Sequence, residues 1–383
     1  MTTPSIKIIY FATCVTICSL YAAQPIQPVF QSEFQLSSFQ AILFTTLMMA
    51  PLGFAPLFYG YLLESFSAKV MVRWALFSLG ILELVFAMAD SYLLLLAIRA
   101  VQGLMIPAIL TSLMSYISYT SSREHVQHAI ASYIAATIVG GFLGRFLSAF
   151  FTDLFGWRFF FVLLGVILLL VSFMLRHMAR DVKMKYARPK FAEITELLQS
   201  REFFFLYSAI FCLFFVFAAL MNFLPFQLKQ MNPGSGEAGI GLLYLGYSMG
   251  IFVSLNSRTI IRFFGNEPDA IGVGIVIFGL GTLIFMVEQY GVMFIGMFVF
   301  CTGLFMAHSL LSGLANKLAE ENKAMANGLY ISFYYTGGTL GSVLPGVVFV
   351  HFGWKMFLLS LLMMVCTALY LVYNLKKAVA GKH

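Results

Sequence analysis

The chain has 383 residues, of which 61% are hydrophobic and only 10% are charged. Soluble globular domains carry about 25% charged residues, so this chain cannot cover itself with a polar surface, and a soluble fold is excluded. The formal net charge is +7, but the basic residues follow a membrane topology, so we expect no nucleic-acid partner.

Long charge-free runs of apolar residues indicate helices that cross a lipid bilayer. Several runs exceed the roughly 20 residues that a spanning helix needs, and the alternating short strands of a membrane barrel are missing from the pattern. We therefore expect an all-α polytopic membrane protein with twelve transmembrane helices. In chain order they are predicted near residues 7–30, 39–62, 71–89, 92–117, 127–150, 159–177, 203–223, 239–258, 270–287, 291–314, 327–350 and 356–374.

The basic residues place both chain ends on one side of the membrane. Of the 23 Lys and Arg residues, 18 lie on the side that holds both termini, and two lie inside predicted spans. The remaining three, Arg158, Lys229 and Lys355, lie on the opposite side. By the positive-inside rule, we expect a multi-pass protein of the cell inner membrane with both termini in the cytoplasm.

The predicted helices divide into two bundles of six, over residues 1–177 and residues 203–383. The segment between them, residues 178–202, is the most polar part of the chain and is expected to be a cytoplasmic linker. Apolar residues recur at helical spacing within it, over residues 191–200, which predicts a short amphipathic helix on the membrane surface. The other loops are too short to hold a soluble catalytic domain.

The two halves are related by an internal repeat that keeps one register. The sequence Phe-Gly-Trp-Arg at residues 155–158 returns 197 residues later as Phe-Gly-Trp-Lys at residues 352–355. A chain of this kind is built from two copies of one unit. Paired repeats in membrane proteins usually place a solute site at their interface, so the repeat points to a transporter.

Glycines of the fifth and eleventh predicted spans follow the same register. Small residues at four-residue spacing let helices approach closely and slide, so we expect these glycines to serve helix packing and gating. They are Gly140, Gly141 and Gly144 in the first half and Gly337, Gly338 and Gly341 in the second.

Short motifs in several predicted helices resemble those of the major facilitator superfamily. Residues 99–103 read Arg-Ala-Val-Gln-Gly and match that family's R-x-x-Q-G motif. Residues 21–28 carry a Y-x-x-Q-P-x-x-P pattern that is similar to a bacterial branch of drug and metabolite exporters. The resemblance covers essentially the whole chain. It implies two pseudo-symmetric six-helix bundles, alternating access, no cofactor and a monomer in membrane lipid.

The loop after the second predicted span resembles the family's G-x-L-x-D-R-x-G-R-R/K signature, which implies a cytoplasmic gate. An anion at a helix N-terminus gains about 0.3–1 kcal/mol, so an acid here can act as a latch. The chain departs from the pattern, because a Glu replaces the Asp and the inner basic residues are missing; the fifth span also lacks the Gly-Pro pair of the antiporter motif. The expected gate residues are Gly60, Glu64, Lys69 and Arg73.

Three ionisable residues, Glu83, Arg99 and Arg145, are predicted at a similar depth inside the membrane. Charges within a bilayer are costly and usually face a cavity or a partner. Either Glu83 neutralises Arg99 across a helix hairpin, or it pairs with Arg145. An arginine can bind a solute carboxylate or phosphate, or an Arg–Glu pair can couple transport to protons as the acid titrates. The resemblance implies the coupling role for Arg99, with Gln102 beside it in the same motif.

Four further residues are candidates for the solute path. His308 lies deep in the tenth predicted span and is either a protonation switch or a hydrogen-bond partner of a neighbouring helix. Gln24 and Gln27 lie on either side of a proline in the first span, where they line the path or stabilise the outer loop. Tyr334 offers an aromatic face with a hydroxyl, although aromatic side chains more often pack against lipid or a neighbouring helix.

The expected function is secondary active transport of a small organic solute, as proton-coupled efflux. Uptake of a carboxylate-bearing metabolite is the alternative, and a non-transporting membrane receptor or assembly factor is the alternative from another class. The chain carries no nucleotide-binding loop of the G-x-x-x-x-G-K-[ST] kind. Its intramembrane ionisable groups are too few and too scattered for a recognised catalytic or metal site, so we expect neither an enzyme nor a metalloprotein.

Overall fold

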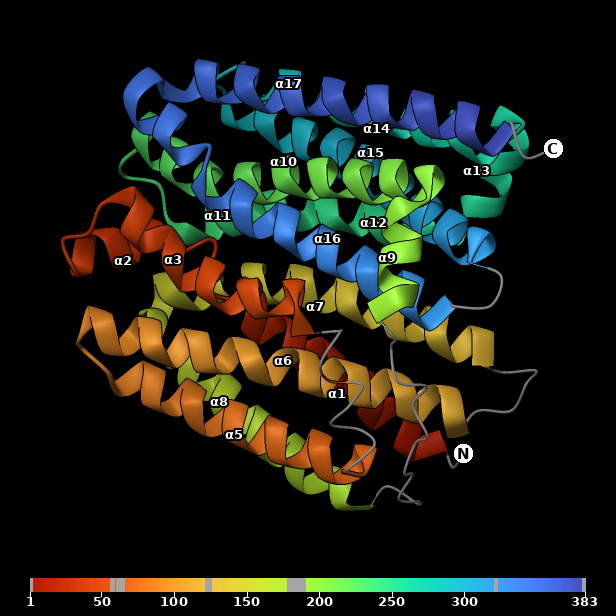
Figure 1. The fold of residues 1–383 in the computed structure, drawn as a ribbon. Helices are drawn as coiled ribbons and strands as arrows, with labels where there is room; N and C mark the ends of the chain where they lie inside the picture. Colours follow the sequence, from red (N-terminus) through yellow and green to blue (C-terminus); the bar gives the residue numbers. More distant parts are fainter. Residues whose placement is uncertain are drawn as a thin grey trace. The chain divides into compact units, whose positions relative to one another are not determined.

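The computed structural model describes residues 3–55, 59, 66–120, 126–177, 191–319 and 323–380, and all regular elements within these ranges are helical (Figure 1). The chain forms two compact units. The first comprises Met1–Arg188 together with Ser235–Leu242, and the second comprises Pro189–Gly234 together with Leu243–His383.

The first unit contains the helices of the first half of the chain. They are α1 (Thr3–Tyr21), α2 (Gln27–Glu33), α3 (Ser38–Met49), η1 (Ala50–Gly53), α5 (Ala68–Met88), α6 (Tyr92–Thr120), α7 (Val126–Phe155), α8 (Trp157–Met174) and η2 (Leu175–His177). Most of α11 (Glu237–Leu243) also belongs to this unit. Its place there is explained by Asp153, whose carboxylate accepts the backbone N–H of Glu237 at 2.6 Å and that of Ala238 at 2.7 Å.

The second unit contains the remaining helices. They are α9 (Phe191–Gln199), α10 (Arg201–Met231), η3 (Tyr244–Tyr247), α12 (Ser248–Leu255), α13 (Ser257–Phe264), α14 (Glu267–Ile284), α15 (Tyr290–Leu318), α16 (Lys323–Val343) and α17 (Gly346–Ala380). The short helix α9 lies inside the segment for which the sequence predicts a surface helix.

Among the described residues, nine helices are long and apolar enough to cross a membrane, and the segments Ile6–Tyr21 and Ser38–Gly53 are shorter apolar helices. Together with α16, whose glycines and tyrosines lower its hydropathy, they make up the polytopic helical fold that the sequence predicts. Large apolar side chains remain exposed on the outside of the bundles, for example Trp74 at 67% and Met363 at 73%. In a membrane these side chains contact lipid.

Four predicted helices are interrupted within the described residues. In the span expected over residues 39–62, α3 ends at Met49 and η1 follows; in the span expected over residues 327–350, α16 ends at Val343 and α17 begins at Gly346. The span expected over residues 7–30 ends at Tyr21 and resumes as α2 at Gln27, because prolines cannot donate a backbone hydrogen bond and Pro28 suits the first turn of a new helix. The span expected over residues 239–258 consists of α11, the tighter η3 and α12. The sequence prediction of one continuous helix was wrong at all four places.

The internal repeat is present in the backbone packing. Gly140 of α7 lies against the backbone of Cys14 in α1, and Gly337 of α16 lies against the backbone of Phe211 in α10. Both members of the second contact lie 197 residues after those of the first. A Cβ atom on Gly140 or Gly337 would lie 3.0 or 2.9 Å from the Cα atom of its partner, so only glycine permits these approaches.

A tyrosine hydrogen bond follows the same register. The hydroxyl of Tyr10 donates to the carbonyl of Ala129 at 3.3 Å, and the hydroxyl of Tyr207 donates to the carbonyl of Ala326 at 3.0 Å. Tyr207 and Ala326 are again 197 residues beyond Tyr10 and Ala129. The two units therefore share specific contacts as well as a helix pattern.

The repeated Gly-Trp turns share a backbone conformation that favours glycine. Gly156 has a φ of 81° and Gly353 a φ of 77°, both in the left-handed region. Each glycine precedes a buried tryptophan, Trp157 or Trp354, at the start of the last span of its unit. The turn thus sends one large side chain into the core of each bundle.

An aromatic cluster fills the core of the first unit and positions the site described below. The rings of Phe30 and Phe44 are 4.6 Å apart, those of Phe86 and Phe161 are 4.7 Å apart, and Trp157 lies 5.0 Å from Phe30. Each of these five side chains is at most 3% exposed. Edge-to-face and tilted contacts of this kind leave ring faces available to a neighbouring cation.

Candidate functional site

Glu83 of α5 and Arg99 of α6 face each other inside the first unit. Arg99 Nη1 lies 3.9 Å from Glu83 Oε1, and both side chains have an exposed fraction of 0%. Of the two pairings that the sequence leaves open, the structure therefore shows Glu83 beside Arg99. The pair forms because α5 and α6 are consecutive antiparallel helices joined by a short turn.

The guanidinium of Arg99 is held by the protein on several sides. Its Nε donates to the backbone carbonyl of Phe44 at 2.9 Å, and its Nη1 donates to Oε1 of Gln102 at 2.9 Å. Its central carbon lies 5.0 Å from the centre of the Phe86 ring and 5.6 Å from that of Phe161. A buried cation is thus stabilised by dipoles and aromatic faces as well as by one carboxylate.

Glu83 has a second partner in another helix. The hydroxyl of Ser19 in α1 donates to Oε1 of Glu83. Among the described residues, Oε2 of Glu83, Nη2 of Arg99 and Nε2 of Gln102 have no hydrogen-bond partner. The carboxylate and the guanidinium therefore retain bonding capacity that a close bidentate ion pair would use up.

Arg145 of α7 occupies a separate buried position in the first unit. Its Nε donates to Oε1 of Gln24 at 2.6 Å, and its Nη1 donates to the carbonyl of Gly141 at 2.6 Å. Its guanidinium lies 3.8 Å from the centre of the Tyr21 ring, and the residue is 1% exposed. The break between α1 and α2 brings Gln24 to this arginine, so the interruption of the first span helps to build the site.

Gln27 lies close to the same break but faces a different helix. Its Nε2 donates to the hydroxyl of Thr45 in α3 at 2.9 Å, and both residues are fully buried. The structure thus brings Gln24 together with Arg145, while Gln27 joins α2 to α3.

His308 of α15 belongs to an aromatic cluster in the second unit. The hydroxyl of Tyr330 lies 2.9 Å from Nδ1 of His308, and the centre of the Tyr334 ring lies 5.0 Å from that of the imidazole. Tyr334 stacks on Phe214 of α10 with their ring centres 3.6 Å apart. The structure thus brings together His308 and Tyr334, two of the residues predicted for the solute path. The imidazole of His308 also has a hydroxyl partner, Tyr330, on α16.

The predicted gate is described only in part, because Gly60 and Glu64 lie outside the described residues. Lys69 and Arg73 lie in the first turns of α5, whose start is capped by Ser67. The backbone carbonyl of Arg73 accepts the hydroxyl of Ser172 at 2.9 Å. Their role in a latch stays a prediction.

The predicted glycines have two distinct environments. Gly140 and Gly144 meet the backbone of α1, and Gly337 and Gly341 meet the backbone of α10. The carbonyls of Gly141 and Gly338 serve instead as acceptors, for Arg145 and for the hydroxyl of Ser342. The first four glycines are sites of close helix approach, and the latter two supply backbone oxygens that accept hydrogen bonds.

Two polar partners were not foreseen from the sequence. Ser19 was missed because serine is common in apolar helices and carries no signal of its own. The second is the buried hydrogen bond from Nδ2 of Asn222 to the hydroxyl of Ser342, at 2.8 Å. The repeat register does not mark this bond, because Ser342 lies 197 residues after Arg145 but Asn222 lies 198 residues after Gln24, one position out of register.

Known proteins resemble the chain over most of its length. Residues 9–263 match the family model of the Major Facilitator Superfamily. The inner membrane transport protein YnfM of Escherichia coli (strain K12) is 29% identical over 357 residues, which cover 91% of this chain and 84% of that protein. The MFS-type transporter YybF of Bacillus subtilis (strain 168) is 26% identical over 371 residues, covering 95% of this chain and 91% of that protein.

A solved structure shares the fold. A bacterial homologue of the human lysosomal transporter Spinster, in an inward-facing and occupied conformation, matches with a TM-score of 0.77 and 15% sequence identity. The match covers 98% of this chain and 96% of that one. At this level of identity, the likeness concerns the fold alone.

Proposed function

This chain belongs to the major facilitator superfamily and is a multi-pass membrane transporter rather than an enzyme, and we propose that it exports a small organic solute in exchange for protons. The buried Glu83–Arg99 pair is the observation that carries the proposal. In it, Glu83 takes up a proton from one side of the membrane and releases it to the other.

The surroundings of the pair support a titrating carboxyl. Removing two charges from water costs several kcal/mol per ion, and a well-formed ion pair offsets that cost only with close hydrogen bonds. The separation here is 3.9 Å, against about 2.7–2.9 Å for a close charge-assisted hydrogen bond. When Glu83 binds a proton, Arg99 keeps Gln102 and the carbonyl of Phe44, so the cation does not lose all of its support.

The repeat gives a second argument that the pair serves transport. Leu280 and Gly296 occupy the positions that correspond to Glu83 and Arg99, 197 residues later. Helices α14 and α15 nevertheless form the same kind of hairpin as α5 and α6. The α14–α15 hairpin therefore folds with an apolar residue and a glycine at these two positions, its ion pair between Glu267 and Lys317 lying at an exposed end. A costly buried charge in only one copy is best explained by a function.

Arg145 is the proposed contact for an anionic group of the solute. A guanidinium is planar, always charged and presents its donors in a fork that matches a carboxylate or phosphate. The guanidinium of Arg145 is buried in the first unit, beside Gln24 and the carbonyl of Gly141. Gln102, Gln27, His308 and Tyr334 complete the proposed set of polar and aromatic residues along the solute path.

The remaining parts of the proposal concern topology. We propose a monomer in the cytoplasmic membrane with both termini inside the cell. The orientation is supported by the Lys and Arg residues, most of which lie at the ends of the predicted spans on that side. Gly60, Glu64, Lys69 and Arg73 form the proposed cytoplasmic gate. The contacting glycines of α7 and α16 permit helix movement during alternating access.

Uptake of a carboxylate-bearing metabolite is the second candidate, and Arg145 is the observation that favours it. A buried arginine with an aromatic face and two close acceptors resembles a carboxylate-recognition group. In that case the solute and the proton move in the same direction. The sign of the proton movement that accompanies a solute gradient separates the two candidates.

The proposed coupling is tested in proteoliposomes that contain a pH-sensitive dye. A thermal-shift screen of metabolites and drugs first identifies a solute, because a ligand of the folded state stabilises it by mass action. For wild type, an outward or inward solute gradient is expected to drive proton movement. Glu83→Gln is expected to lower this flux by about tenfold or more while solute exchange without net proton movement persists.

Glu196→Gln is the matched control, because it removes a carboxylate from the exposed face of α9. It is expected to leave the proton flux at the wild-type level. An unchanged solute-driven proton flux in both Glu83→Gln and an Arg99→Gln variant rejects the coupling role of the pair.

A further inference from the structure

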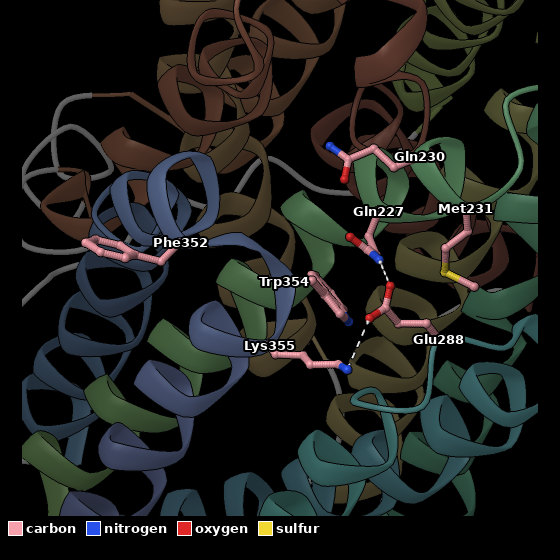
Figure 2. Close-up of a pocket in the computed structure, with 7 residues that line it drawn as sticks. All are labelled: Gln227, Gln230, Met231, Glu288, Phe352, Trp354 and Lys355. Carbon is pink, nitrogen blue, oxygen red and sulfur yellow. Dashed lines mark hydrogen bonds and ion pairs between the residues drawn. The ribbon is translucent and has the colours of Figure 1, made fainter.

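A cavity of about 400 Å³ lies at one end of the second unit, and it has no place in the proposed coupling mechanism. We call it the α10–α17 pocket. It opens where α10 ends, where α14 turns into α15 and where the kink at Gly353 begins the last span. Figure 2 shows its lining residues, which are Gln227, Gln230, Met231, Glu288, Phe352, Trp354 and Lys355.

One acid and one base are held apart in this pocket. Glu288 lies between Gln227 and Lys355 (Figure 2): its Oε2 accepts Nε2 of Gln227 at 3.0 Å, and its Oε1 lies 3.9 Å from Nζ of Lys355. The two charged side chains are 41% and 71% exposed. An exposed ion pair at this distance is weak, so a ligand can separate the two charges at little cost.

The corresponding corner of the first unit holds its base in ion pairs. Arg158, the repeat counterpart of Lys355, bonds Asp90 at 2.6 Å and also pairs with Glu33. The indole of Trp157 donates to the same Glu33 at 2.6 Å. This corner therefore satisfies its arginine with two carboxylates.

One sequence difference distinguishes the corner of the second unit from that of the first. Gln230 lies 197 residues after Glu33, so the carboxylate that receives both the indole and the base in the first unit is replaced by an amide. The indole of Trp354 donates instead to the backbone carbonyl of Phe285 at 2.8 Å. Within the part of the chain that the structure describes, Lys355 is left with one carboxylate, at 3.9 Å, beside a cavity.

We propose that the α10–α17 pocket binds a small zwitterion that carries an ammonium group and an anionic oxygen group. The ammonium meets the carboxylate of Glu288, and the anionic group meets the ammonium of Lys355, so that one weak pair is replaced by two. A simple anion is repelled by Glu288, and a simple cation is repelled by Lys355. The cavity volume lies within the range of small-molecule sites.

Two sources supply this chemistry at the end of a membrane span. One is a free amino acid or a similar soluble zwitterion. The other is a lipid headgroup of the phosphoethanolamine type, whose acyl chains would run beside the exposed ring of Phe352. Binding at this pocket does not depend on the coupling role of Glu83, and it is measured without transport.

Calorimetric titration of the purified full chain tests the proposal. The probes are phosphoethanolamine and β-alanine as zwitterions, with inorganic phosphate and ethanolamine as single-charge controls. At least one zwitterion is expected to bind about tenfold more tightly than either control. Glu288→Gln and Lys355→Gln each are expected to weaken that binding about fivefold or more, since each leaves one ligand charge without a partner.

Two further variants use the repeat. Gln230→Glu copies the first unit by adding a carboxylate for Lys355, and it is expected to weaken zwitterion binding. Arg158→Gln, the matched control in the first unit, is expected to leave binding unchanged. A variant that fails to purify as a folded monodisperse protein is replaced by Glu288→Asp, which keeps the charge and retains the preference for a zwitterion.

Native mass spectrometry tests whether the ligand is a lipid headgroup. The protein is taken from vesicles that contain both phosphatidylethanolamine and phosphatidylglycerol. The proposal is supported, with lipid as the ligand, if the wild-type protein retains phosphatidylethanolamine in preference to phosphatidylglycerol and if Glu288→Gln and Lys355→Gln lose this preference. This holds even when the soluble probes do not bind. The proposal is overturned when neither assay shows a zwitterion preference. It is equally overturned when the preference survives in both charge variants.

Discussion

The geometry of the Glu83–Arg99 pair indicates whether the pair serves the stability of the fold or the function of the protein. A pair retained for architecture is expected to form close, saturated hydrogen bonds, because uncompensated buried charge is expensive. Here the ions are 3.9 Å apart, and an oxygen of Glu83 and a nitrogen of Arg99 have no hydrogen-bond partner among the described residues. Such an arrangement has room for a proton or for a change of partner.

A pair of neutral variants measures the cost of each buried charge. Glu83→Leu, which copies Leu280 of the second unit, is expected to destabilise the protein by about 3–5 kcal/mol, because Arg99 stays buried without its carboxylate. Glu83→Leu combined with Arg99→Met is expected to recover most of this loss, because no unpaired charge remains. The measurement is the apparent melting temperature in detergent.

Both of these variants are expected to lose solute-driven proton flux. The interpretation fails if the single and the double variant melt at the same temperature. It also fails if the double variant, without either charge, still couples solute to protons.

Ser19 contributes a hydrogen bond that joins α1 to the pair. Ser19→Ala removes the donor to Oε1 of Glu83, and the expected loss is about 1–3 kcal/mol of stability because the acceptor is buried and charged. Thr16→Val is the matched control, since the hydroxyl of Thr16 donates to the carbonyl of Ala12 in its own helix, at 2.7 Å. Equal melting temperatures for the two variants would show that the hydrogen bond from Ser19 does not contribute to the stability of the protein.

At the scale of helices, the sequence predicts more of the packing than of the polar contacts. The positions of the close glycine contacts were predicted, because the repeat and the four-residue spacing both mark them. The break after Tyr21 was not predicted, because Pro25 and Pro28 allow either one kinked helix or two separate helices. That break brings Gln24 to Arg145. The partner of this arginine could not be predicted, because the hydrophobic periodicity of the sequence does not show where the backbone of a helix breaks.

Glycine contacts between α10 and α16 set how closely these two helices approach. Gly337→Ala is expected to lower stability by about 1–3 kcal/mol, because the added methyl group meets the backbone of Phe211, which cannot move as a side chain can. Gly328→Ala on the same helix is the control, because nothing lies within 4 Å of its added Cβ. Alanine is favoured over glycine within helices, so this control is expected to be neutral or stabilising.

A thermal melt of the two alanine variants checks this expectation. If Gly337→Ala melts at or above the wild-type temperature while remaining folded, the close approach of α10 and α16 does not require glycine. A parallel Gly140→Ala variant examines the equivalent contact of the first unit.

At the scale of the whole molecule, composition and the repeat were sufficient for the fold class, and the short motifs pointed to the family. The 0.77 TM-score bears out the fold, and the match to the family model bears out the family. The contact of Asp153 with the start of α11 could not be predicted, because 84 residues separate Asp153 from Glu237 and nothing in their local sequences marks a partner. Long-range polar contacts of this kind follow from the fold and are not visible in motifs.

The proposed orientation makes a prediction for cysteine labelling in intact cells. With the five native cysteines replaced by alanine, a cysteine at Asn232 is expected to react with a membrane-impermeant maleimide. A cysteine at Lys382 is expected to react only after the membrane is permeabilised, because the positive-inside rule places this terminus in the cytoplasm. Labelling of Lys382→Cys in intact cells would show that the C-terminus lies outside the cell, which contradicts the proposed topology and the cytoplasmic location of the gate.

The central claim is that Glu83 gains and loses a proton during transport, and difference infrared spectroscopy of the reconstituted protein tests it most directly. On addition of a transported solute, wild type is expected to show a change in the carbonyl stretch of a protonated carboxylic acid, and Glu83→Gln is expected to lack it. A band that persists unchanged in Glu83→Gln would contradict the account, because the titrating carboxyl would then belong to another residue.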